Sequence, residues 1–135
     1  MGQQQLLLII LGVIIVGIAI AVGITMFSSS SVQANKDAIV NDLNNLAANA
    51  YQFKIRPCTM GGGGSTYAGG SCSPANPYVI PTKLASNDNA TYTATVTAIA
   101  VTFTGSSRSY NGSTVTAVCD TSGRLGNFTY AGEFL

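Results

Sequence analysis

MGQQQLLLIILGVIIVGIAIAVGITMF, residues 1–27, is the stretch that decides the fold. It contains no Lys, Arg, Asp or Glu, and from Leu6 to Phe27 only Thr25 and glycines interrupt the apolar run. An apolar run of about 20 residues crosses a bilayer as a helix, because each residue adds about 1.5 Å. The stretch lacks the basic N-terminal region and the small-residue cleavage site of a secretory signal peptide. We therefore predict a hydrophobic helix that sits in a membrane or packs against copies of itself.

A second helical pattern follows in residues 28–55, although this segment opens with four serines. An apolar stripe recurs every three to four positions and is broken only at Lys36. Its members are Val32, Ile39, Leu43, Leu46, Ala50 and Phe53. Helices usually end before the residue that precedes a proline, and Pro57 stops this pattern. We predict one long helix over about residues 2–54, whose second half covers a sheet through Ile39, Leu43, Leu46 and Phe53.

Residues 90–131 show a strand pattern. ATYTATVTAIAVTFTG, residues 90–105, alternates threonine with apolar residues, and the alternation shifts near Ala98–Ala100, which predicts a bulge or a bend. Asn111-Gly112 is a hairpin turn signal. Ser113–Cys119 then forms a strand with Val115, Ala117 and Cys119 on one face, and Asn127–Ala131 forms a short last strand.

These elements predict an α+β fold. A long N-terminal hydrophobic helix packs by its C-terminal half on a small antiparallel sheet of three or four strands. We divide the chain into the helix, residues 1–55, and a β-rich head, residues 56–135. Within the helix, residues 1–27 sit in a membrane or pack against copies of the chain, and residues 28–55 pack on the sheet.

A glycine- and proline-rich segment, residues 57–81, joins the helix to the strands. Its GGGGS run lacks the Lys of a phosphate-binding P-loop and follows no strand. We therefore interpret the segment as a flexible linker between the helix and the sheet. Cys58 and Cys72 flank the glycines, and we expect a disulfide between them to close this flexible loop. Cys119 then remains a free buried thiol, although its pairing with either of the other two stays open.

Composition excludes several functions. Charged residues make up 8% of the chain, the net charge is +1, and no basic cluster occurs, which argues against a nucleic-acid partner. Histidine is absent, and with it the commonest general base and metal ligand. No acid pair or nucleophile with its base is recognisable, so we expect no enzyme, no catalytic residue, no metal site and no cofactor. Asp88 and Asp120 lie in turn contexts, where Asp caps its own backbone.

Three sequons mark possible glycosylation sites at Asn89, Asn111 and Asn127. Each asparagine is followed two positions later by Ser or Thr. Chance matches are frequent in a chain this rich in Asn, Ser and Thr, so the sequons alone decide nothing.

The first 55 residues resemble the N-terminus of a mature type IV pilin or of a related pseudopilin. Those proteins begin with a few hydrophilic residues and a glutamate, followed by an unbroken Leu/Ile/Val/Ala/Gly helix. Here Met1 aligns with the first mature residue and Gln5 with the glutamate, or Gly2 is the cleavage-site glycine and Gln3 the first mature residue. Gln5 is neutral, so only a hydrogen bond replaces the family's charge pair with a neighbour's amine. The proline that usually kinks this helix is also missing, since none occurs before Pro57.

The resemblance implies a major structural subunit of an extracellular filament that polymerises with copies of itself. It implies an inner-membrane precursor, an assembly machinery with a prepilin peptidase, and a role in adhesion, motility or surface attachment. The residues assigned to assembly lie on the hydrophobic helix: Met1, Gln5, Leu6, Leu7, Ile10, Gly12, Gly17 and Gly23.

Two alternatives stay open at this point. One is a pseudopilin, the short-lived subunit of a secretion machine. The other is a monomeric binding domain held by a single membrane-spanning helix.

Overall fold

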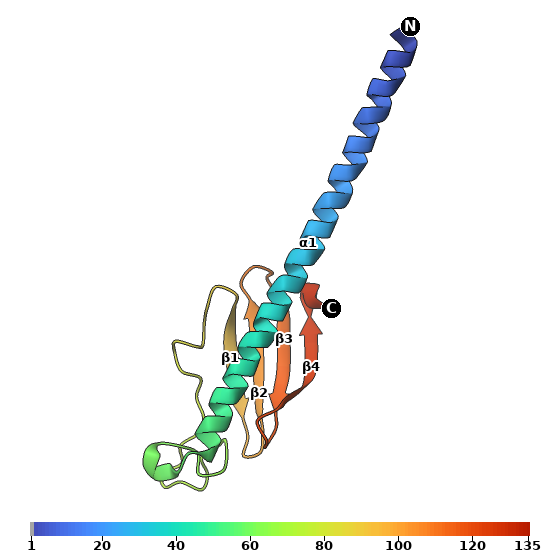
Figure 1. Cartoon of the computed structure of the whole chain (residues 1–135). Coiled ribbons are helices and arrows are strands. Elements are labelled where there is room, and N and C mark those ends of the chain that lie inside the picture. The colour runs from blue at the N-terminus through green and yellow to red at the C-terminus, as the bar shows by residue number, and fades with distance from the viewer. Residues whose placement is uncertain (1) are drawn as a thin grey trace. The chain divides into compact units, whose positions relative to one another are not determined.

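The computed structural model describes residues 2–135 (Figure 1). Helix α1 is followed by a 3₁₀ turn, four strands and a second 3₁₀ turn, and the α+β class is confirmed. The elements are α1 (Gly2–Ile55), η1 (Cys58–Met60), β1 (Ala90–Val96), β2 (Val101–Ser107), β3 (Thr114–Cys119), β4 (Leu125–Ala131) and η2 (Gly132–Phe134). The chain divides into two compact units, a first that ends at Gln33 and a second, Ala34–Leu135. The boundary between them therefore falls inside α1, not at its end.

In the second unit, residues 34–55 of α1 lie across one face of the sheet (Figure 1). Ile39, Leu43 and Leu46 are buried there, as predicted, together with Ala47 and Ala50. Their spacing of three to four residues places them on one side of the helix. Burial of each large aliphatic side chain contributes about 1.5–3 kcal/mol, so this stripe holds helix and sheet together.

Phe53, a member of the predicted stripe, and Lys36, which interrupts it, make contacts of other kinds. Phe53 is only half-buried, and its ring lies 5.5 Å from that of Tyr78, centroid to centroid. Lys36, which breaks the stripe, places its ammonium group 4.0 Å from the centre of the Tyr130 ring on β4. A cation over an aromatic face is favourable by about 0.5–1 kcal/mol at exposed sites. The break in the pattern is therefore a helix–sheet contact of a different kind.

The sheet is an antiparallel meander in the order β1-β2-β3-β4. Side chains alternate between its faces, and the predicted inward set of Val115, Ala117 and Cys119 is fully buried. The partner strand contributes Val101 and Phe103 to the same core. A sheet with one covered face explains the Thr/apolar alternation of the sequence.

Of the two predictions near Ala98–Ala100, a bulge or a bend, the bend is confirmed. Val96 pairs with Val101, and residues 97–100 reverse the chain between β1 and β2. The Thr97 N–H donates to the Ala100 carbonyl at 2.8 Å, and the Ala100 N–H donates to Thr97 Oγ1 at 3.0 Å. A threonine side chain thus supplies the turn that glycine or asparagine usually supplies. The pairing of β3 with β4 is irregular instead, between Thr116 and Val118.

Gly105 on β2 lets the helix approach the sheet closely. A Cβ at this position would lie 2.7 Å from Ile39 Cγ2 and 3.0 Å from Tyr92 Cε1. The backbone of Gly105 is itself buried. Glycine within a strand weakens it, so a close approach of other atoms is the usual reason for keeping one.

The glycine-rich segment is not a flexible linker, contrary to the prediction, because it is hydrogen-bonded to the end of α1. Its backbone N–H groups cap the end of α1, where helix carbonyls would otherwise lack partners. Gly63 donates to the Phe53 carbonyl at 2.9 Å, Gly64 to that of Arg56 at 3.1 Å, and Ser65 to that of Lys54 at 2.8 Å. The glycine-rich segment therefore supplies the hydrogen-bond donors that water would otherwise supply to the helix terminus.

The predicted disulfide between Cys58 and Cys72 is confirmed, with the Cα atoms 5.5 Å apart. A loop of this length contributes about 3 kcal/mol in the chain-entropy model. Gly64 lies beside the bridge with φ +58, and a Cβ there would lie 2.6 Å from the Cys58 sulfur. Only glycine satisfies both the left-handed backbone and the nearby sulfur.

Candidate functional sites on the helix and the second unit

The first candidate site is the apolar stretch of α1 from Leu6 to Phe27. Its large side chains are all exposed, from 52% at Ile14 and Val22 to 77% at Phe27. Leu6, Leu7 and Ile10 belong to this set, and Gln5 is exposed just before it. Met1 lies outside the described residues. By length and composition, α1 contains a stretch able to cross a membrane.

The glycines of this stretch have no packing role within the described chain. A Cβ added at Gly12, Gly17 or Gly23 would meet nothing within 4 Å. Glycine inside a helix costs about 1 kcal/mol relative to alanine, and no neighbour among residues 2–135 compensates for it. A surface this apolar, on which small residues interrupt large ones, is typical of helices that pack in lipid or against other helices.

A second group of residues ties α1 to the sheet through polar contacts, and Asp42 is its centre. Asp42 Oδ2 accepts hydrogen bonds from the Tyr92 hydroxyl at 2.5 Å, Asn87 Nδ2 at 2.7 Å and Asn89 Nδ2 at 3.4 Å. Burial and then the hydrogen bond to Asp42 raise the pKa of the Tyr92 hydroxyl. Asp42 is half-buried, although its position among the polar residues of α1 would by itself indicate a solvated carboxylate. Its partners lie 45 to 50 residues away, beyond the reach of a periodicity argument.

The three sequons lie in different environments. Asn89 is half-buried, and its amide nitrogen is engaged by Asp42. Asn111 is exposed in the turn between β2 and β3. Asn127 is exposed on β4 with a left-handed φ of 52. A glycan attached to nitrogen would therefore replace an existing contact at Asn89, whereas Asn111 and Asn127 project from exposed backbone.

Asp120 caps the turn before β4, as the sequence predicted. Its Oδ1 accepts hydrogen bonds from the Ser122 hydroxyl at 2.7 Å, the Ser122 N–H at 2.9 Å and the Arg124 N–H at 3.0 Å. The hydrogen bond from the Ser122 side chain, followed by that from the Arg124 backbone, lowers the pKa of this carboxyl. Among residues 2–135, no three His, Cys, Asp or Glu side chains gather in a way that would hold a metal ion.

Cys119 is the free and buried thiol that the sequence predicted. Burial raises the pKa of the thiol, and the Tyr67 hydroxyl lies 3.4 Å from its sulfur. The same hydroxyl donates to the Asp120 carbonyl at 2.5 Å. A buried thiol with a raised pKa is a poor nucleophile, so Cys119 serves the core.

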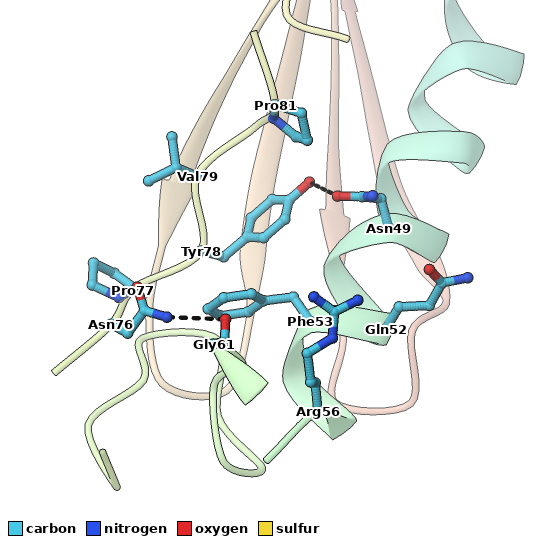
Figure 2. A pocket seen from close by; sticks show the side chains of 10 residues that line it. All are labelled: Asn49, Gln52, Phe53, Arg56, Gly61, Asn76, Pro77, Tyr78, Val79 and Pro81. Atoms are coloured by element: carbon cyan, nitrogen blue, oxygen red, sulfur yellow. Dashed lines mark hydrogen bonds between the residues drawn. The ribbon is translucent and has the colours of Figure 1, made fainter. Parts of the chain in front are cut away.

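A pocket of about 300 Å³ lies at the end of α1 (Figure 2). One wall carries Asn49, Gln52 and Arg56, which recur at helical spacing. The opposite wall is the extended segment 76–81, and Phe53 and Tyr78 lie between the two walls. Sequence reasoning missed this pocket, because its polar wall comes from residues that read only as the polar face of a helix.

Two hydrogen bonds fix the pocket. The Tyr78 hydroxyl donates to Asn49 Oδ1 at 2.9 Å, and Asn76 Nδ2 donates to the Gly61 carbonyl at 3.1 Å (Figure 2). The Tyr78 N–H also donates to the Tyr67 carbonyl at 2.8 Å, which holds the segment in place. Burial raises the pKa of Tyr78 to about 12. Its hydroxyl therefore remains a proton donor to Asn49 at neutral pH.

Comparisons with known protein families, with characterised proteins and with solved structures find no match to this chain. The fold and the exposed helix together define a class in broad terms: a small disulfide-bonded α+β protein with one helix apolar and long enough to cross a membrane.

Proposed function

We propose that this chain is the major subunit of an extracellular filament of the type IV pilus kind. Its precursor sits in the inner membrane through residues 1–27, and the mature subunits polymerise by packing these helices together. The filament serves adhesion, motility or surface attachment. The observation that carries the proposal is the exposure of every large side chain from Leu6 to Phe27, together with glycines that no described residue contacts.

Physical chemistry supports burial of this surface against lipid or protein. Burial of each large apolar side chain is favourable by about 1.5–3 kcal/mol. Exposure of the whole stretch to water therefore costs a few tens of kcal/mol of burial free energy. Lipid and neighbouring helices remove this penalty about equally, because both are apolar. A filament built in this way is stable in water once formed, but extraction of each subunit from the membrane requires external work.

The second unit fits the outer surface of such a filament. Strand β1 exposes threonine, the C-terminal end of α1 is capped by backbone N–H groups, and a disulfide closes the loop from Cys58 to Cys72. Disulfides persist in oxidising compartments outside the cytoplasm, which agrees with export. A prepilin peptidase and an assembly motor are the partners that this proposal requires.

Cross-linking in cells tests the proposal and separates it from its alternatives. Ile14→Cys introduces an exposed thiol into the apolar stretch, while the native free thiol, Cys119, is buried. Oxidation of sheared surface material is expected to give dimers through a disulfide between neighbouring helices. Thr93→Cys, exposed on β1, is the matched control and is expected to cross-link less, because it lies on the outer unit.

The location of the product decides among the candidates. Dimers in the sheared extracellular fraction support the filament. Dimers confined to the membrane fraction favour the pseudopilin. Ile14→Cys protein that stays monomeric in the membrane contradicts both and leaves the anchored binding domain.

A further inference from the structure

We propose that the pocket at the end of α1 binds a single hydroxylated ring that bears a carboxylate, of the size of one hexuronic acid residue. The pocket measures about 300 Å³, at the lower end of the range for small-ligand sites. The proposal is independent of filament assembly, because every residue that lines the pocket belongs to the second unit.

The charge of the pocket selects an anion. Arg56 is the one charged residue among the ten that line it, and none of the ten is acidic. A guanidinium matches a carboxylate through two parallel hydrogen bonds. The pocket lies at the C-terminal end of α1, where the helix dipole disfavours negative charge, so Arg56 alone must balance the bound anion. One arginine balances a carboxylate, whereas a phosphate dianion would carry more charge than it balances.

The side-chain amides select a ring with hydroxyl groups. Asn49 accepts from Tyr78 through its oxygen, which fixes the amide and directs its NH₂ group as a donor. Gln52 offers both a donor and an acceptor one helical turn away. Hydroxyl groups donate and accept as well, so they satisfy such amides, whereas a purely aromatic acid would leave them without partners.

Aromatic and proline side chains provide flat apolar surface for the body of the ring. Tyr78 is buried, at 4% exposure, and its ring packs against that of Phe53 with the centroids 5.5 Å apart. The half-buried Phe53 and the exposed Pro77 and Pro81 of the opposite segment therefore supply this surface (Figure 2). The C–H groups of a sugar ring pack on such surfaces, while its hydroxyls and carboxylate face the polar wall. Asn49, Tyr78 and Asn76 are held by hydrogen bonds already present, so binding requires ordering only of the exposed Gln52 and Arg56 side chains.

The test is an NMR titration of the full-length ¹⁵N-labelled chain in dodecylphosphocholine micelles, which carry no sugar head group. Galacturonate is the probe, and methyl galactoside is its neutral counterpart. A ligand of about 13 non-hydrogen atoms at ordinary efficiency gives a Kd on the order of 1 mM. Shifts are expected at the side-chain amides of Asn49 and Gln52, with methyl galactoside binding about tenfold more weakly.

Two variants examine the assigned roles. Arg56→Gln is expected to weaken galacturonate binding about tenfold and to leave methyl galactoside unchanged. Asn49→Asp keeps the shape and still accepts from Tyr78, but its charge repels the carboxylate, so galacturonate binding is lost. Arg108→Gln is the matched control, because Arg108 lies outside the pocket and donates to Ser86.

Three results would overturn the proposal. They are equal affinity for galacturonate and methyl galactoside, unchanged binding by both pocket variants, and tighter binding of inorganic phosphate than of galacturonate. A trisaccharide of galacturonate distinguishes two sources of the same ligand. Binding at least as tight as that of the monomer assigns the site to the end of an acidic polysaccharide, and binding of the monomer alone assigns it to the free acid.

Discussion

Asp42 receives three side-chain hydrogen bonds on a single oxygen atom, from residues that precede and begin the sheet. Hydrogen bonds to a charged acceptor are worth about 1.5–3 kcal/mol, roughly twice the value of neutral ones. The polar contacts thus reinforce the apolar stripe on the neighbouring side of α1. They also explain why Asn87 and Asn89, which read as loop residues in the sequence, are held in defined positions.

Asp42→Asn is expected to lower the free energy of unfolding of the second unit by about 1–2 kcal/mol. The shape is retained, but the acceptor loses its charge. Urea unfolding of the full chain in micelles, followed by near-ultraviolet circular dichroism, measures the change. Asp88→Asn, at an exposed position, is the control and should stay within about 0.5 kcal/mol of the native protein. Equal stabilities for both variants would show that the Asp42 contacts contribute nothing.

Three tyrosines make the protein sensitive to alkali. Burial raises the pKa values of Tyr67, Tyr78 and Tyr92, that of Tyr78 to about 12. A tyrosine in the unfolded chain loses its proton near pH 10, while the folded protein keeps it. Above pH 10 the unfolded state binds fewer protons, so the free energy of unfolding falls with rising pH.

We expect ionisation of these tyrosines to leave the free energy of unfolding unchanged below pH 10 and to lower it steadily from pH 10 to 12. Urea midpoints across this range measure the decline, and absorbance of the phenolate reports ionisation on unfolding. Tyr78→Phe removes one of the three groups and should make the decline less steep. A stability that stays level to pH 12 would contradict the burial of these hydroxyls.

Among the elements, α1 and the strands were largely predictable from periodicity. The spacing of Ile39, Leu43 and Leu46 identified the helix face, and the alternation of Val115, Ala117 and Cys119 identified the strand face. Both patterns are local, since neighbouring turns and alternate residues share a face by geometry. The same reasoning accounts for the correct fold class.

Features that depend on contacts across the fold were missed or misread. Residues 97–100 contain no glycine, proline or asparagine, so only the shift in alternation predicted their bend, and the hydrogen bonds of Thr97 that close the turn gave no signal. The capping of α1 by the glycine-rich segment requires knowing where that segment returns. The pocket around Asn49 and Arg56 requires knowing which segment faces the helix end. None of these follows from residues adjacent in the chain.

Gly105→Ala tests the close contact between helix α1 and the sheet. The added Cβ would lie 2.7 Å from Ile39 Cγ2, so helix and strand must move apart. Overpacking of this kind costs about 1–3 kcal/mol, measured by urea unfolding. Gly126→Ala is the control, because a Cβ there meets nothing within 4 Å. A Gly105→Ala protein as stable as its control would show that the helix lies farther from the sheet.

For the whole molecule, the proposed assembly predicts that folding and polymerisation respond oppositely to one substitution. A Cβ at Gly17 would meet no atom of the described chain within 4 Å, and Gly17→Leu removes a helix-weakening residue, so the subunit should fold at least as well. Leucine prevents the close approach of neighbouring helices that glycine allows, and we expect a marked loss of filament from the sheared fraction. Ile20→Leu, which preserves volume, is the control. A normal filament yield from Gly17→Leu would show that this glycine does not lie in the interface between helices.

Cryo-electron microscopy of fibres sheared from the cell surface, with the N-terminal peptide read by mass spectrometry, tests the central proposal most directly. The account predicts a helical polymer in which residues 6–24 pack in the core and the second unit faces solvent. It also predicts a first residue of Met1 or Gln3. A chain that yields no fibres and is recovered from the membrane as a detergent-dependent monomer would contradict the account.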